Sequence, residues 1–124
     1  MQTIKYLLRY GLFFWICIIW FISSLPGDSL PKFDSFNVDK LAHTAMYLVF
    51  SILLFVNYNN GLFKKLCRYD VLLLIVMLAS FDEAHQVFIK FRAVSVLDLS
   101  ANLFGVVLGY FLIKSFDNYN DRIQ

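Results

Sequence analysis

The hydrophobic residues of this chain fall into four long runs separated by short polar segments. A helix needs about 20 mostly apolar residues to cross the hydrocarbon core of a bilayer. The runs predict helices at about residues 6–25, 40–58, 71–89 and 96–116. Pro26 and Gly27 follow the first run and are residues that end a helix. We therefore predict an all-α membrane bundle of four transmembrane helices, forming a single domain over residues 1–124.

Three of these runs allow a second interpretation. Lys5 and Arg9 resemble the charged start of a signal peptide, but the apolar stretch behind them is long and aromatic and lacks an A-x-A-like cleavage site. The third and fourth runs are unbroken only over 71–81 and 103–113, as in buried soluble helices. Because a clear span precedes them, we interpret both as transmembrane helices with polar halves.

Composition agrees with a lipid environment. The chain is 60% hydrophobic and 19% aromatic, whereas an ordinary soluble domain is about 45–50% apolar. Net charge is only +2, without the basic stripe of a nucleic-acid binder. Cys17 lies in an apolar run and Cys67 beside basic residues, so we predict no disulfide.

The distribution of Lys and Arg predicts the orientation, because positive charge marks the cytoplasmic side. If the N-terminus is inside, the inner segments hold Lys5, Arg9, Lys64, Lys65, Arg68, Lys114 and Arg122. The outer segments then hold Lys32, Lys40, Lys90 and Arg92. Both termini are therefore predicted to be cytoplasmic, and the polar ends of the last three spans lie on the outer side.

The second span carries one polar stripe. Asp39, His43 and Tyr47 repeat at i, i+4 and i+8, which places them on one helix face, and Lys40 lies beside them. Asp39 has the alternative interpretation of a helix N-cap. His43 has that of a histidine hydrogen-bonded between helices.

The third span becomes polar near its end. Glu83 and Gln86 are three residues apart and share a face, whereas we expect Asp82 and His85 to point elsewhere. Nothing structural in the sequence demands a glutamate at this position. Arg92 follows in the turn before the fourth span, and its guanidinium suits a phosphate or carboxylate. Its alternative interpretation is an interfacial anchor.

The fourth span combines polar and small residues. Asp98 and Asn102 begin a stripe that continues through Gly105 and Gly109. Ala101, Gly105 and Gly109 form a small-residue face that allows close helix packing. Asp98 has the alternative interpretation of an N-cap.

These polar groups fall at similar membrane depth, where an unpaired ionisable group costs several kcal/mol. We therefore expect them to meet in a polar pocket that opens to the outer surface. His43 and Glu83 are the candidate acid–base pair if the site is catalytic. The candidate ligand-binding residues are Asp39, Lys40, Tyr47, Gln86, Arg92, Asp98 and Asn102. His43, Glu83, His85 and Asp39 are ligand types that suit zinc, but their spacing is no known metal signature, so we predict no metal and no cofactor.

The motifs together resemble the VanZ-like family of bacterial membrane proteins. They are D-K-x-x-H-x-x-x-Y at 39–47, E-x-x-Q-x-F at 83–88 with Arg92 behind it, and D-x-x-x-N-x-x-G-x-x-x-G at 98–109. The loop at 23–27 also fits. The resemblance implies a multi-pass, four-helix protein of the bacterial cell membrane. The family's founding member is linked to resistance to glycopeptides of the teicoplanin type.

Three functions are compatible with this pattern, and binding and catalysis both stay open. The first is binding or modifying an envelope lipid, either a phospholipid or a polyprenyl-linked cell-wall precursor, with Arg92 and Lys40 holding a phosphate. The second is a small proton-coupled transporter, because intramembrane Glu and His serve as proton relays; an oligomer would have to complete its path. The third is a structural subunit of a membrane complex, with the polar residues acting only between helices.

Overall fold

The computed structural model describes residues 2–29 and 36–123, and within these ranges it is helical and contains no strand. Its elements are α1 (Gln2–Ser23), the 3-10 turn η1 (Gly27–Ser29), α2 (Phe36–Asn59), α3 (Arg68–His85), the 3-10 turn η2 (Gln86–Phe88) and α4 (Val96–Ile123). The all-α prediction with four membrane-length helices is confirmed for this part of the chain. Lys32, which entered the charge count, lies outside the described residues.

Helix ends differ from the hydrophobic boundaries for local reasons. α1 stops at Ser23 because the residue before Pro26 is disfavoured in helical conformation. α3 starts earlier than predicted because the Asp70 carboxylate accepts a 2.8 Å hydrogen bond from the backbone N–H of Cys67. α4 continues to Ile123, well past the apolar run. Hydrophobicity marks the membrane span, whereas backbone hydrogen bonding can extend a helix into water.

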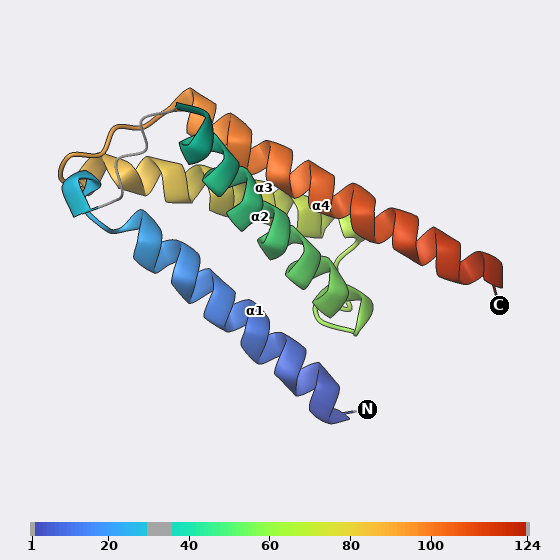
Figure 1. Ribbon diagram of the computed structural model, residues 1–124. Helices are drawn as coiled ribbons and strands as arrows, with labels where there is room; N and C mark the ends of the chain where they lie inside the picture. Colours follow the sequence, from blue (N-terminus) through green and yellow to red (C-terminus); the bar gives the residue numbers. More distant parts are fainter. Residues whose placement is uncertain (1, 30–35, 124) are drawn as a thin grey trace.

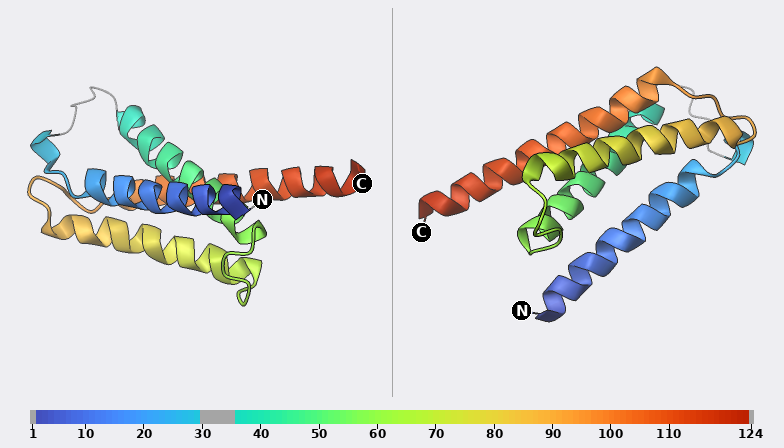
Figure 2. Two further views of the ribbon diagram at one scale, coloured as in Figure 1. Left: turned by 90° about the horizontal axis from the view of Figure 1, so that it is seen from below. Right: turned by 180° about the vertical axis from the view of Figure 1, so that it is seen from behind.

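One end of the bundle gathers four helix ends. The end of α1, the start of α2, the end of α3 and the start of α4 lie together, as Figure 1 shows. The two chain termini and the α2–α3 connection lie toward the opposite end. Figure 2 gives the same arrangement from two further directions. The polar residues predicted from the sequence belong to the first of these ends.

α2 and α4 form the most extensive helix pair. A Cβ atom at Gly105 would lie only 2.3 Å from the carbonyl oxygen of Thr44, and one at Gly109 only 2.7 Å from the Cβ of Ser51. Thr44 Oγ1 also donates to the carbonyl of Ala101 at 3.2 Å. The small-residue face of α4 therefore packs directly on the α2 backbone, as such faces do in membrane helix pairs.

α1 is fastened to α2 by side chains that bond to backbone carbonyls. Trp15 Nε1 donates to the carbonyl of Met46 at 3.0 Å. Near the other end of the pair, Asn57 Nδ2 donates to the carbonyl of Leu8 at 3.0 Å. These two bonds hold the middle of α1, from Leu8 to Trp15, alongside α2.

The outer surface is apolar, as expected for contact with lipid. Phe14 on α1 is 66% exposed and Phe111 on α4 is 55% exposed. The inside is closed by fully buried residues such as Phe55, Ile75 and Val106. Because soluble monomers rarely expose large apolar areas of this kind, the fold belongs in a bilayer.

Candidate functional site

A cavity of about 340 Å³ lies at the end of the bundle where α1 ends, α2 begins and α3 ends. It is lined by Ile22, Ser23, Leu25, Asp39, Ala42, His43, Met46, Tyr47, Asp82, Gln86 and Arg92. The lining mixes apolar side chains with charged and hydrogen-bonding ones. Five of the sequence-predicted site residues therefore share one cavity.

α2 supplies a row of three polar residues to the cavity lining, which we call the α2 ladder. Asp39, His43 and Tyr47 all line it, and each lies one helical turn, about 6 Å, beyond the previous one. The Asp39 side chain is 50% exposed, whereas Tyr47 is only 2% exposed. Asp39 thus marks the mouth of the cavity and Tyr47 its floor.

Asp82 closes the floor from α3. Its Oδ2 accepts a 3.0 Å hydrogen bond from the Tyr47 hydroxyl, and the residue is only 4% exposed. The expectation that Asp82 points away from the site is therefore wrong. Asp82 and Gln86 are four positions apart, at i and i+4, and share the face that lines the cavity. That i, i+4 spacing places Asp82 on one face with Gln86, but it does not say by itself that this face turns toward α2.

Glu83 lies outside the residues that line the cavity, although it is 2% exposed. Its Oε1 accepts a 2.7 Å hydrogen bond from the backbone N–H of Ser95, just before α4. Its Oε2 accepts a 3.4 Å hydrogen bond from Gln86 Nε2. The structure thus gives Glu83 a structural partner, contrary to the sequence-based view that nothing structural requires a glutamate there. Glu83 reaches the cavity only through Gln86.

The orientation of the His43 ring is set by a contact with α4. Its Nδ1 lies 3.0 Å from Oδ1 of Asn102, a residue that is fully buried. Because an amide oxygen only accepts, Nδ1 carries a proton in this arrangement. The other ring nitrogen, Nε2, lies 3.9 Å from the Asp39 carboxylate. Asn102 therefore positions the histidine without lining the cavity itself.

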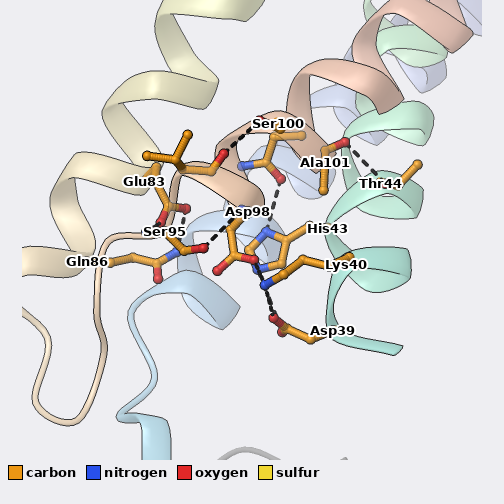
Figure 3. Close-up of polar contacts among 12 residues, drawn as sticks. Asp39, Lys40, His43, Thr44, Glu83, Gln86, Ser95, Asp98, Ser100 and Ala101 are labelled. Carbon is orange, nitrogen blue, oxygen red and sulfur yellow. Dashed lines mark hydrogen bonds and ion pairs between the residues drawn. The ribbon is translucent and has the colours of Figure 1, made fainter. Parts of the chain in front are cut away.

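Lys40 and Asp98 form an ionic cluster beside the cavity. The Lys40 ammonium contacts the carboxylates of both Asp39 and Asp98, as Figure 3 shows. Ligand-type atoms of Asp39, His43 and Asp98 lie within 4.8 Å of one another, with the lysine cation between the two carboxylates. Neither Glu83 nor His85 joins this group, and Lys40 is not among the cavity-lining residues.

The interpretation of Asp98 and Asp39 as N-caps is corrected by the helix starts. α4 is capped by Ser95, whose Oγ lies 3.3 Å from the backbone N–H of Asp98. Asp98 is therefore in the first turn. α2 begins at Phe36, so Asp39 is also inside the first turn. Negative charge is stabilised at both positions by the helix dipole.

Arg92 lies in the connection between α3 and α4, and its side chain binds the end of α1. Its Nε and Nη2 donate to the carbonyl oxygens of Leu25 and Ile22 at 3.3 and 3.1 Å. Ile22 is in the last turn of α1 and Leu25 follows the helix, a region where backbone carbonyls lack the regular intrahelical partners. The backbone N–H of Gly27 donates to the carbonyl of Lys90 at 3.1 Å. Arg92 therefore fixes the α1 end while its side chain lines the cavity.

The fold and the site together define a multi-pass α-helical membrane protein with a cavity of mixed polar and apolar lining at one end of its helices. The chain belongs to the VanZ/LLP1 family, because the model of that family matches residues 4–117, nearly its whole length. This confirms the resemblance found from the motifs. No curated protein and no solved structure matches the chain.

Proposed function

We propose that this VanZ-like protein binds a lipid or a lipid-linked cell-wall component in the cavity at the ends of α1, α2 and α3. The observation that carries the proposal is the mixed lining of the cavity. Ile22, Leu25 and Met46 give it apolar surface, and His43 and Arg92 give it polar groups. An amphipathic ligand with a polar head and a hydrocarbon chain matches such a lining.

The energetics of the lining support a ligand. Ser23 Oγ and Asp82 Oδ1 are buried and have no hydrogen-bond partner among the described residues. An unpaired buried polar group costs about 1–3 kcal/mol, so an apolar lining would give a more stable bundle. A cavity volume of about 340 Å³ also falls in the range of roughly 300–1,000 Å³ that is typical of small-molecule sites.

We propose that the cavity opens to the outer face of the bacterial cell membrane. The argument is the excess of Lys and Arg at the opposite end, which includes Lys5, Arg9, Lys64, Lys65 and Arg68. With that end in the cytoplasm, the cavity mouth lies at the depth of outer-leaflet headgroups. Phospholipids and polyprenyl-linked precursors are both accessible there.

If the site also modifies its ligand, His43 is the cavity residue suited to proton transfer. Asn102 fixes the ring through Nδ1, and Nε2 lies on the side of the Asp39 carboxylate. Glu83 would contribute through Gln86, with which it shares a hydrogen bond. Binding needs fewer assumptions than turnover and is the function that the geometry supports best.

A proton-coupled transporter or a structural subunit finds less support. Beyond the cavity, the buried polar side chains of α2 are Ser51 and Asn57. Both donate to backbone carbonyls, at 2.9 Å for Ser51 and 2.8 Å for the nearer Asn57 bond. They act as ties between and within helices and offer no continuous proton path.

The binding proposal is tested by filling the cavity. Ala42 lines it, so Ala42→Phe should abolish retention of phospholipid or polyprenyl phosphate by the purified protein, measured by native mass spectrometry. Ala84→Phe adds the same volume at an exposed position of α3 and should leave retention unchanged. Equal lipid retention by both variants would refute binding in this cavity.

The link to glycopeptide resistance follows from the family resemblance and is a separate part of the proposal. Expression of the chain in a susceptible bacterium should raise the inhibitory concentration of teicoplanin. The Ala42→Phe variant should lose this effect and the Ala84→Phe variant should keep it. An unchanged inhibitory concentration with the wild-type chain would remove the link to resistance while leaving lipid binding standing.

A further inference from the structure

We infer that a basic hollow near the start of α1, at the end of the bundle opposite the cavity, binds the headgroup of an anionic phospholipid from the surrounding bilayer. The basic hollow is lined by Gln2, Lys5, Tyr6 and Arg9, and its two cations hold the lipid phosphate. This surface is separate from the cavity, and its occupancy does not depend on what the cavity binds.

The two ends of the bundle differ in charge. At the end that holds the cavity, the described residues include five acidic side chains and three basic ones. At the opposite end, the described side chains include six basic residues and two acidic ones, namely Lys5, Arg9, Lys64, Lys65, Arg68 and Lys114 against Asp70 and Asp117. Anionic lipids are attracted to clusters of Lys and Arg at the membrane surface, so they are drawn to the end away from the cavity.

Both of those acidic side chains have partners elsewhere. The Asp117 carboxylate forms an ion pair with Arg68 at 2.9 Å and also accepts from Asn59 Nδ2 at 3.1 Å. The Asp70 carboxylate accepts the backbone N–H of Cys67 at the start of α3. The cations at the start of α1 are therefore left without a counter-charge among the described side chains.

The basic hollow suits a phosphate. Lys5 and Arg9 are four positions apart and share a helix face, where they line a space of about 180 Å³. Like charges at this spacing destabilise a helix, and an anion held between them turns that repulsion into attraction. The side chains of Lys and Arg only donate hydrogen bonds, and phosphate oxygens accept them. None of the four lining side chains has a hydrogen bond or ion pair with another described side chain.

The depth of the basic hollow identifies the anion as part of a lipid. Tyr6 and Tyr10 are 53% and 70% exposed on α1, and Tyr69 is 73% exposed at the start of α3. Exposed tyrosines of membrane helices gather at the level of the headgroups. Leu7, which is 72% exposed beside the basic hollow, offers apolar contact to an acyl chain. A headgroup phosphate therefore reaches Lys5 and Arg9 while its chains stay in the hydrocarbon core.

Two lipids that share their chains and phosphate test the inference. Dioleoyl phosphatidylglycerol has a net negative charge, whereas in dioleoyl phosphatidylcholine the choline cation cancels it. Each is titrated onto the detergent-purified full chain by calorimetry at low ionic strength, because salt screens exposed charges. Lipid retained through purification at physiological salt reports on the cavity instead. Phosphatidylglycerol should bind roughly thirtyfold more tightly, about fivefold for each of two cations. Equal affinity for the two lipids would overturn the inference.

Single charge removals locate the binding surface. Lys5→Gln and Arg9→Gln should each lower the preference for phosphatidylglycerol about fivefold, and Arg9→Lys, which keeps the charge, should retain most of it. Lys90→Gln removes one exposed charge at the other end of the bundle and should change nothing. An equal loss in Lys90→Gln, or no loss in Lys5→Gln and Arg9→Gln, would overturn the assignment to this surface. Equal melting temperatures in phosphatidylcholine micelles check that the variants fold alike.

The Ala42→Phe variant separates this surface from the cavity. The substitution fills the cavity at the other end of the bundle and should leave the preference for phosphatidylglycerol unchanged. Loss of the preference in Ala42→Phe would place the anionic lipid in the cavity and overturn the inference. If Ala42→Phe keeps the preference and also keeps the lipid retained through purification, the basic hollow stands and the cavity proposal falls.

Discussion

Glu83 at the end of α3 accepts a 2.7 Å hydrogen bond from the backbone N–H of Ser95, where α4 begins. In a capping box, an acidic or amide side chain three residues into the helix takes this N–H. Here that position is Asp98, which contacts Lys40 instead. A neighbouring helix therefore completes the cap of α4, and the end of α3 is tied to the start of α4.

We expect Glu83→Ala to lower the free energy of unfolding by about 1–3 kcal/mol, because it leaves the Ser95 N–H without its acceptor. Glu83→Gln keeps a carbonyl oxygen at this position and should cost clearly less. Denaturation in mixed detergent micelles measures both values, and Ser80→Ala, exposed on the same helix, serves as the control. Equal losses for the two Glu83 variants would argue against the capping role.

Gly105→Ala should destabilise the bundle by about 1–3 kcal/mol, the usual cost of overpacking. The added Cβ would lie 2.3 Å from the carbonyl oxygen of Thr44, a backbone atom that cannot move away easily. A Cβ added at Gly11 would meet nothing within 4 Å, so Gly11→Ala should be neutral or slightly stabilising. Melting temperatures in detergent compare the two, and a harmless Gly105→Ala would mean that α2 and α4 lie farther apart.

Tyr47→Phe removes the hydroxyl that bonds to Asp82. We expect a loss of about 1 kcal/mol in the free energy of unfolding, since hydrogen bonds between membrane helices are modest. The control is Tyr69→Phe, because Tyr69 is 73% exposed on the same bundle. If both variants unfold at the same denaturant concentration, the Tyr47–Asp82 bond contributes nothing to stability.

Arg92→Ala should loosen the end of α1, because the carbonyls of Ile22 and Leu25 lose the guanidinium as a donor. The expected readout is faster hydrogen exchange of amides around residues 22–25, followed by mass spectrometry. Lys90→Ala, an exposed neighbour in the same turn, should leave exchange unchanged. Identical exchange in wild type and Arg92→Ala would show that the guanidinium does not hold α1.

Cysteine labelling tests the orientation. Cys67 is exposed in the α2–α3 connection, and a cysteine in place of the exposed Asp28 reports on the opposite end of the bundle. In a Cys17→Ser background, a membrane-impermeant maleimide should label Asp28→Cys in intact cells and Cys67 only after permeabilisation. The reverse pattern would put the cavity on the cytoplasmic side.

The sequence by itself determined the four apolar helices and the polar face of α2. Span lengths follow from the thickness of the hydrocarbon core. The α2 ladder of Asp39, His43 and Tyr47 follows from the helical repeat, because spacings of four residues share a face. Both are properties of a single helix and need no knowledge of its neighbours.

Only the tertiary structure decided which polar residues of α3 reach the cavity. Asp82, Glu83, His85 and Gln86 point around the whole helix, because successive residues turn by about 100°. Periodicity therefore does not say which of them faces α2 and which faces α4. The rotation of α3 is set by packing on both neighbours. That packing turns Asp82 to Tyr47 at the cavity floor and Glu83 to Ser95 at the start of α4.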